Sequence, residues 1–260
     1  MNIFKELLTY KDLLVILTLR DIKIRYKQAA MGFVWAIFMP IIAILAGLFV
    51  KKAIAMVSGR PLDMGDVISL AVKVLPWTFF VSSIRFAVNS LVGNRELVTK
   101  IYFPREVFPL ASTLACLFDF FIAAVSLVLL LIISHAGISI YILWLPLLLI
   151  FLIIFTTGLG LFLSAANLFY RDVKYVVEII LMFGIFFTPV FYDAQQFGKY
   201  KTLLLLNPMG SILESINNIV VLHKMPEPFW LFYAGITSVA MLLLGLIVFH
   251  KTEPLFAENI

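Results

Sequence analysis

The residues best suited to chemistry in this chain are three histidines and one cysteine, and their spacing defines no site. His135, His223 and His250 are far apart and fall in expected loops or at the ends of apolar segments. Without an H-E-x-x-H motif or a Cys/His cluster, the sequence predicts no metal site. Cys116 is the only cysteine and lies in an apolar run, so we expect a small buried hydrophobe and no disulfide within the chain.

Motifs for nucleotide binding and hydrolysis are absent as well. No G-x-x-x-x-G-K-[ST] phosphate loop occurs, so ATP-driven work by this protein would need a partner. No G-x-S-x-G motif and no pair of carboxylates in one expected pocket supports a hydrolase or a glycosidase. We therefore predict that the chain is not an enzyme and binds no cofactor of its own.

Four polar residues stand out because they lie inside apolar segments. Arg85 and Asn89 are one helical turn apart, and Asp119 and Glu178 occur in two other segments. An ionisable side chain costs about 2.5–3.5 kcal/mol to place in lipid, so these side chains should face protein or water. We predict that Arg85 and Asp119 form a structural ion pair and that Glu178, near the cytoplasmic mouth, contacts substrate or a partner.

The composition requires that these residues be positioned by membrane-spanning helices. Hydrophobic residues make up 63% of the 260 residues and charged residues 13%, against roughly 45–50% and about 25% in soluble domains. Although the net charge is +5, the Lys and Arg residues cluster beside apolar stretches, so we expect no nucleic-acid binding. The prediction is an all-α integral membrane protein with a single transmembrane domain over residues 1–260.

Apolar stretches long enough for about 20-residue spans recur along the chain. We expect six spans within residues 32–250, at about 32–50, 67–91, 107–133, 142–167, 175–191 and 229–249. The 156–165 stretch contains small residues of the kind that let helices approach closely in lipid.

The segments outside the spans set the expected topology. Residues 1–28 combine an amphipathic interface helix, at about 2–19, with a basic segment, and residues 251–260 form a tail. Lys and Arg residues are in excess on the side of both termini, so we predict a multi-pass protein with both termini cytoplasmic. Lys51 and Lys52, at an outer end, oppose this rule. Two apolar patches within 192–228 are too short to span and predict re-entrant or interfacial helices at the outer face.

Several segments in order along the chain carry a resemblance to a known family. They are LTLRDIKIRYKQAAMGFVWAIFMPI at 17–41, LPWTFFVSS at 75–83, VGNRELVTKIYFPREVFPLAS at 92–112, LFYRDVKYVVEIILMFGIFFTPVFY at 168–192 and NPM at 207–209. Together they resemble the permease subunits of ABC-type polysaccharide and polyol-phosphate exporters, most closely the O-antigen branch. Teichoic acid exporters share these motifs, so the branch stays open.

The resemblance implies a homodimer in the bacterial inner membrane that pairs with two copies of an ABC ATPase subunit. ATP and Mg²⁺ would be bound by that subunit, and the substrate would be a lipid-linked polysaccharide moved to the outer leaflet. The expected ATPase contacts lie in the N-terminal segment and in NRELVTKIYFPRE, and are Arg20, Asp21, Lys23, Arg25, Tyr26, Glu96, Lys100, Tyr102, Phe103, Pro104 and Arg105. The alternative is that the basic residues only follow the positive-inside rule and contact lipid phosphates.

A path for a sugar chain would use aromatic rings, which stack on the apolar faces of sugars. The resemblance places the walls on the first and fifth spans, and the candidates are Trp35, Phe38, Met39, Glu178, Met182, Phe186, Phe187 and Phe191. The alternative for each ring is a lipid-facing position. Two other functions remain open, namely a membrane glycosyltransferase or acyltransferase and an ABC permease for small hydrophobic molecules.

Overall fold

The computed structural model describes residues 9–27, 32, 34–59, 61–100 and 103–259. All regular structure in these residues is helical. The long helices are α2 Lys11–Tyr26, α3 Val34–Ser58, α4 Met64–Gly93, α6 Val107–Ile133, α7 Leu145–Phe169, α8 Val173–Phe187, α10 Pro208–Val220 and α11 Pro228–Thr252. The short helices are α5 Arg95–Lys100, η1 Ile140–Trp144, η2 Ala194–Tyr200, α9 Lys201–Leu205, η3 Glu253–Leu255 and α12 Phe256–Asn259.

Five of the six expected spans are confirmed by length and composition. They are Val34–Ala53, Met64–Gly93, Val107–Ile133, Ile140–Phe169 and Pro228–Leu255. The expected fifth span, 175–191, is the 15-residue helix α8, which rises about 22 Å at 1.5 Å per residue. It ends at Phe187 because Pro189 disfavours helical backbone at Thr188, which is extended at φ −114° and ψ 136°.

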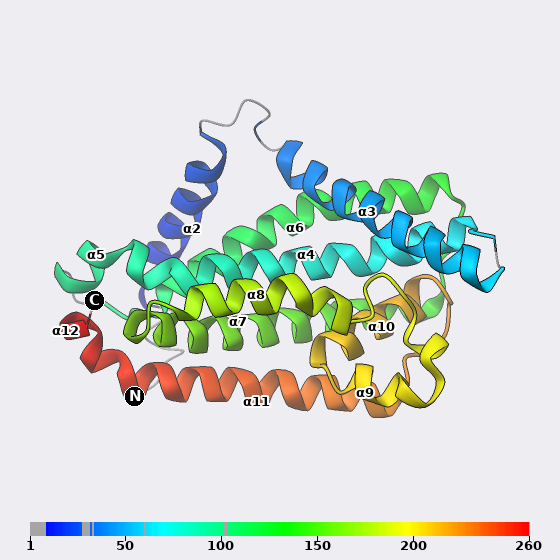
Figure 1. Cartoon of the computed structure of the whole chain (residues 1–260). Coiled ribbons are helices and arrows are strands. Elements are labelled where there is room, and N and C mark those ends of the chain that lie inside the picture. Colours follow the sequence, from blue (N-terminus) through cyan, green and yellow to red (C-terminus); the bar gives the residue numbers. More distant parts are fainter. Residues whose placement is uncertain (1–8, 28–31, 33, 60, 101–102, 260) are drawn as a thin grey trace.

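Helix α4 is the central element of the bundle. Figure 1 shows it running between α3 and α6 on one side and α7 and α8 on the other. A capping box starts the helix, in which the Asp63 side chain accepts from Asp66 N–H and the Asp66 side chain accepts in return. Most of α4 is buried, so its accessible side is a narrow strip.

Helices α7 and α11 cross at a close contact made by two glycines. A Cβ added at Gly158 would lie 2.5 Å from Leu242 Cα, and one added at Gly245 would lie 2.2 Å from the Gly158 carbonyl oxygen. Only glycine leaves room for this approach of two backbones. The close packing predicted for 156–165 is therefore confirmed.

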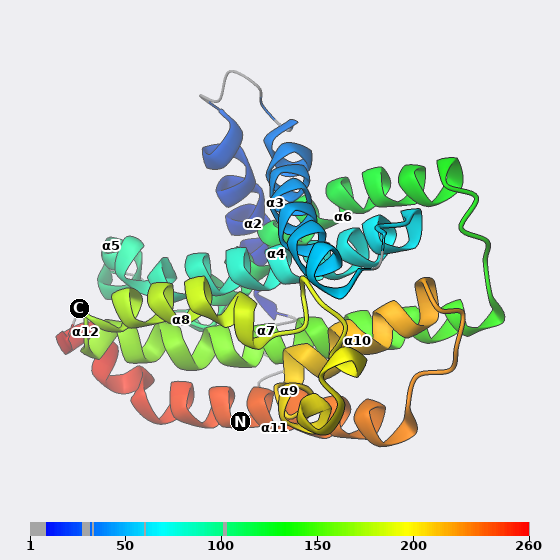
Figure 2. The same cartoon turned by 45° about the vertical axis from the view of Figure 1, so that its right-hand side comes forward.

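The N-terminal region forms one helix through the expected basic segment. Helix α2 packs on α6 through buried Leu17 and Ile22, and Figures 1 and 2 show it steeply inclined to the long helices. Ile16 and Ile24 of the same helix are exposed. The first part of the expected interface helix, residues 1–8, lies outside the described residues.

The two apolar patches of 192–228 form α9 and α10 at the end of the bundle opposite α5 and α12 (Figures 1 and 2). Asn207 caps α10 by accepting from Met209 N–H at 3.1 Å, and Pro208 occupies the first turn. Residues 209–219 of α10 are all buried, against α4, α7 and α11. Both helices are too short to cross a membrane, as the sequence predicts.

Candidate translocation path and partner-facing end

A line of polar side chains follows the accessible side of α4, namely Thr78, Ser82, Arg85 and Asn89. They recur at intervals of three or four residues, which places them on one helix face. We refer to these four residues as the polar strip. Thr78 and Ser82 are half-buried, whereas Arg85 and Asn89 are exposed. Between Ile68 and Leu91, every other side chain of α4 except Val81 and Phe86 is buried, so this strip is the polar part of the helix that meets the surroundings.

Arg85 of the polar strip forms a two-pronged ion pair with Glu178 of α8. Its Nε donates to Oε1 at 2.7 Å and its Nη2 donates to Oε2 at 2.8 Å. About half of each side chain is exposed, 50% for Arg85 and 46% for Glu178. Asn89 Nδ2 donates to the Arg85 carbonyl oxygen at 3.0 Å. This geometry leaves a charged pair at the surface of two apolar helices.

The predicted ion pair between Arg85 and Asp119 is wrong. Asp119 of α6 faces α2, where it accepts from Arg25 Nη1 at 2.5 Å and from the Tyr26 hydroxyl at 2.6 Å. Arg85 points from α4 toward α8 instead. The two residues were paired only because both are charged within spans, and the sequence does not give the rotation of one helix relative to the other.

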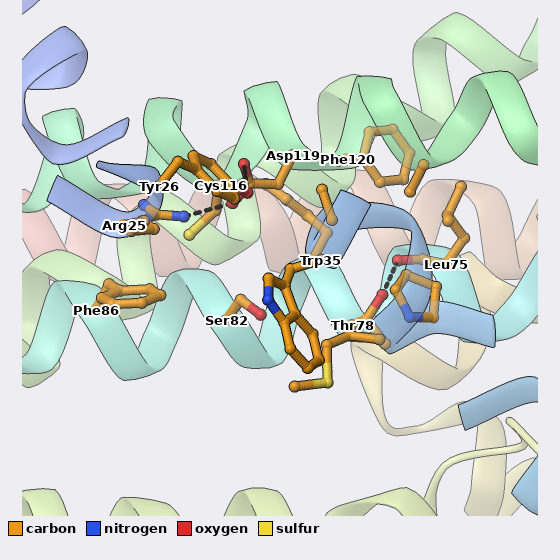
Figure 3. A pocket seen from close by; sticks show the side chains of 15 residues that line it. Arg25, Tyr26, Trp35, Leu75, Thr78, Ser82, Phe86, Cys116, Asp119 and Phe120 are labelled. Atoms are coloured by element: carbon orange, nitrogen blue, oxygen red, sulfur yellow. Dashed lines mark hydrogen bonds and ion pairs between the residues drawn. The ribbon is translucent and has the colours of Figure 1, made fainter. Parts of the chain in front are cut away.

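A cavity of about 350 Å³ lies between α2, α3, α4 and α6, beside the polar strip. Figure 3 shows Trp35 and Phe86 on its walls and, at one end, Asp119 with its partners Arg25 and Tyr26. The Arg25 guanidinium lies 4.2 Å from the Phe86 ring centroid. Burial raises the pKa of the Tyr26 phenol, and so does its hydrogen bond to Asp119. Tyr26 is therefore a neutral donor at this end of the cavity.

Most of the predicted path residues are exposed on the two helices that pack on α4 beside the strip. Trp35, Phe38 and Met39 are exposed on α3. On α8, the exposed residues are Met182, Phe186 and Phe187. Phe191 differs from the expectation, because its side chain is 8% exposed and packs against Gly47 of α3.

The residues predicted to contact an ATPase fall into exposed and internal groups. Glu96 and Lys100 are exposed on α5 and pair with each other at 3.4 Å, and Lys23 is exposed on α2. Arg20 pairs with Asp21 at 2.8 Å. Arg25 and Tyr26 contact Asp119 inside the protein, as described above. Phe103 is buried, Pro104 and Arg105 are half-buried, and Tyr102 lies outside the described residues.

Sequence reasoning missed a buried ion cluster at the α9–α10 end. Lys73 of α4 is 1% exposed and lies 2.6 Å from Asp193 and 3.0 Å from Glu214 of α10. Its Nζ also donates to the Tyr192 carbonyl oxygen at 3.1 Å. Burial raises the pKa of the Asp193 carboxyl, but the charges of Lys73 and Lys51 outweigh it and leave that pKa below its usual value. The signal was present as a lysine inside a span, although neither partner could be read from the sequence.

A neighbouring ion pair accounts for Lys51, one of the two basic residues that oppose the positive-inside rule in the expected topology. Lys51 is buried and its Nζ lies 3.3 Å from Asp66 Oδ1 at the start of α4. Its charge is therefore neutralised within the protein, and the rule, which concerns free charges in loops, does not apply to it.

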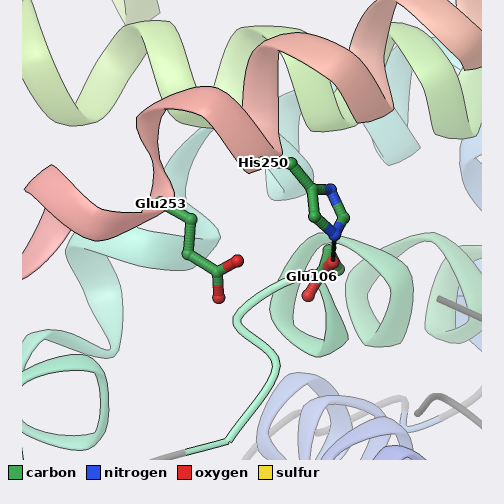
Figure 4. A group of neighbouring side chains, drawn as sticks. All are labelled: Glu106, His250 and Glu253. Atoms are coloured by element: carbon green, nitrogen blue, oxygen red, sulfur yellow. Dashed lines mark ion pairs between the residues drawn. The ribbon is translucent and has the colours of Figure 1, made fainter. Parts of the chain in front are cut away.

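At the opposite end, the structure brings together Glu106, His250 and Glu253 (Figure 4). One ligand atom from each lies within 4.8 Å of the others. His250 Nε2 is 3.0 Å from Glu106 Oε1, and Arg105 Nη1 is 3.8 Å from Glu253 Oε1. Because Glu106 already has His250 as a partner and Glu253 has Arg105, the cluster has the composition of a network of polar contacts within the protein.

Fold and site together define a class of protein. The described part of the chain is an all-helical bundle with five apolar helices long enough to span a membrane and a charged, accessible strip on the central helix, which is the organisation of a membrane transport protein. The model of the family "ABC-2 type transporter" matches residues 12–221, and the chain belongs to this family.

Relatives of known name extend over nearly the whole chain. The O-antigen export system permease protein RfbA of Klebsiella pneumoniae is 28% identical, over 95% of this chain and 94% of its own. The protein of the same name from Myxococcus xanthus is 28% identical over 100% and 99%. The polysialic acid transport protein KpsM of Escherichia coli is 26% identical over 91% and 92%.

Proposed function

We propose that this chain is the transmembrane subunit of an ATP-driven ABC transporter that exports a lipid-linked polysaccharide, of the O-antigen kind, across the bacterial inner membrane. The relatives named above are described as exporters or transporters of O-antigen and polysialic acid, which are both polysaccharides. The observation that carries the proposal is the half-exposed Arg85–Glu178 pair on the polar strip.

A charged pair on the surface of two membrane helices needs a polar surrounding. If the strip faced lipid, two half-exposed charges would lie in hydrocarbon at a cost of several kcal/mol. Water and a hydroxyl-rich chain both remove that cost. We therefore infer that the strip faces a hydrated path, formed when a second copy of this chain packs against the first.

The helices that flank the strip suit a sugar chain. Trp35, Phe38 and Phe186 offer exposed rings on α3 and α8. Aromatic faces hold sugars weakly by stacking, while the polar strip exchanges hydrogen bonds with hydroxyl groups. Weak contacts of both kinds would let a long polymer slide through a path without being trapped.

We assign the α5–α12 end to the cytoplasm and the α9–α10 end to the outer face. In this topology α8 is the fifth of six crossings. The residues that follow it extend the crossing to the outer face, since Thr188, Val190 and Phe191 are buried at the α10 end. Helices α9 and α10 would then be re-entrant, with both termini cytoplasmic. The excess of Lys and Arg on the α5 end supports this orientation.

ATP hydrolysis is assigned to a partner subunit, which would bind ATP and Mg²⁺. The exposed residues Glu96 and Lys100 of α5 form the part of the predicted contact set best placed to meet that partner. Two ATPase copies would serve a homodimer of this chain.

The test is the location of the lipid-linked glycan in cells that lack the gene, measured by leaflet-specific labelling and by total extraction. Glycan made in normal amount but held on the cytoplasmic side is the expected result. Complementation with the Arg85→Gln or Glu178→Gln variant should restore export poorly, whereas Glu227→Gln, which breaks an ion pair with Lys201 at the other end, should restore it fully. Glycan that is absent in total, or normally displayed outside, would refute the proposal.

A further inference from the structure

The segment after α11 folds back onto the connection between α4 and α6. Helices η3 and α12 follow α11, and α12 packs against α5 and α7 (Figure 1). Phe256 of α12 is fully buried, with its ring centroid 5.1 Å from that of Phe249 and 6.0 Å from that of Phe169. The expected cytoplasmic tail is thus a packed part of the protein.

Arg105 joins this segment to α5. Its backbone N–H donates to Glu253 Oε1 at 3.3 Å and its Nη1 donates to the Glu253 carbonyl oxygen at 3.3 Å. On the other side, Nη2 donates to the Val98 carbonyl oxygen of α5 at 3.4 Å. A residue predicted from the sequence to meet an ATPase is therefore used inside the chain, between α5 and the C-terminal segment.

A second link joins α11 to the start of α6. His250 Nδ1 lies 3.1 Å from the Leu246 carbonyl oxygen, which can only accept, so Nδ1 carries a proton. His250 Nε2 lies 3.0 Å from Glu106 Oε1, and Glu106 is buried (Figure 4). These two atoms must share a further proton to hydrogen-bond, whether it resides on the imidazole or on the carboxyl.

These links matter because α5 is too short to hold an orientation by itself. It has six residues, and Val98 is its one buried residue. Helices shorter than about 12 residues are marginal without tertiary contacts. Movement of α5 is transmitted to the bundle only if α5 is held firmly against it. The contacts of Arg105 and α12 connect α5 to α11. Helix α11 in turn packs tightly on α7 at Gly158 and Gly245.

We propose that Glu253 and Phe256, supported by His250, are positioning residues that hold α5 and Arg105 in the orientation needed to receive the ATPase subunit. The inference rests on the proposed function in that an ATPase partner docks at this end. It adds the C-terminal segment 253–259 to the ATPase-facing end as the part that fixes the orientation of α5.

The experiment compares two variants with the wild-type chain, each co-expressed with the ATPase subunit and reconstituted in lipid nanodiscs. Glu253→Gln removes the carboxylate charge that lies 3.8 Å from Arg105 Nη1, and Phe256→Ala removes the buried ring. The amount of ATPase subunit retained on the tagged permease and the rate of ATP hydrolysis are measured, together with the thermal midpoint of the permease alone. The matched control is Glu227→Gln, which breaks a glutamate ion pair at the opposite end. The assay temperature is kept well below each midpoint.

For both variants we expect a several-fold loss of retained ATPase while the permease is still folded, and no loss for Glu227→Gln. A purely structural role would lower the midpoint and leave retention unchanged in the folded protein, which would overturn the inference. If Phe256→Ala is too unstable to assay, Glu253→Gln decides, because it removes no buried volume.

Failure of this inference is distinguishable from failure of the proposed function, because retention is measured without glycan. Normal retention by Glu253→Gln overturns the positioning role and leaves export untouched. A wild-type complex that retains the ATPase but exports no glycan overturns the function and leaves the positioning role standing.

Discussion

Helix α4 carries two cations inside the membrane bundle, and their surroundings are opposite. Lys73 is 1% exposed and has two carboxylate partners, Asp193 and Glu214. Arg85, about 18 Å further along the helix by its rise per residue, is half exposed and has one partner, Glu178. The same kind of charge on the same helix is thus enclosed at one end and accessible at the other.

The contrast predicts that the Lys73 cluster stabilises the fold and that the Arg85–Glu178 pair takes part in transport. A buried charge with several partners is costly to disturb, since loss of one partner leaves the others unpaired in a poor solvent. An accessible pair contributes little to stability, because water already solvates both groups. The stability of the protein should therefore depend on Lys73 and its transport on Arg85.

The largest expected effect is on stability at Lys73. The Lys73→Met substitution leaves Asp193 and Glu214 without their main partner and should lower the free energy of unfolding by about 3–5 kcal/mol. Thermal unfolding in detergent measures the change. Combining Lys73→Met with Glu214→Leu should recover part of the loss by removing the more buried of the two carboxylates. An unchanged thermal midpoint in the Lys73→Met variant would contradict the structural role assigned to Lys73.

The next effect tests whether apolar packing matters as much as the buried charges. Gly158→Ala would place a Cβ 2.5 Å from Leu242 Cα and force α7 and α11 apart. We expect a loss of about 1–3 kcal/mol, as for other overpacked contacts. Gly93→Ala, where a Cβ meets nothing within 4 Å, is the control for the change of residue type. Equal effects of the two substitutions would mean that the close crossing does not stabilise the bundle.

The sequence predicted the elements better than the contacts between them. Apolar runs gave the five confirmed spans, and the small residues of 156–165 gave the close helix pair, because both depend on composition within one segment. The end of α8 at Phe187 was missed by four residues, although Thr188 and Pro189 carried the signal.

Pairing of charges could not be predicted, because it depends on how each helix is rotated and how deep it sits. Arg85 and Glu178 are 93 residues apart in sequence, and so are Tyr26 and Asp119, so no local pattern joins either pair. The same limit hid the C-terminal contacts of Glu253, which follow from a turn after α11 that composition does not encode.

A smaller effect on stability, with a larger one on transport, is expected at the accessible pair. Arg85→Gln should change the free energy of unfolding by about 0–1 kcal/mol, discounted for exposure, while lowering glycan export several-fold. Leaflet-specific labelling of the glycan and the thermal midpoint are measured on the same variant. The exchange Arg85→Glu with Glu178→Arg keeps the pair and should recover part of the export. A variant that loses stability but exports normally would reverse the assignment of the two cations.

The smallest effect concerns the pH dependence of the enclosed cluster, through Asp193. The charges of Lys73 and Lys51 hold the pKa of Asp193 below its usual value in the folded protein, despite the opposing effect of burial. A carboxyl with a lowered folded pKa stabilises the protein fully above its unfolded pKa, about 4, and loses that contribution as the pH falls through the folded value. The difference in thermal midpoint between the wild type and Asp193→Asn should therefore stay constant from about pH 7 to about pH 5 and shrink below about pH 4. Because other carboxyls titrate in both proteins, the difference isolates Asp193. A difference that grew as the pH fell would mean that Asp193 is held protonated by its burial and that Lys73 is neutralised by Glu214 alone.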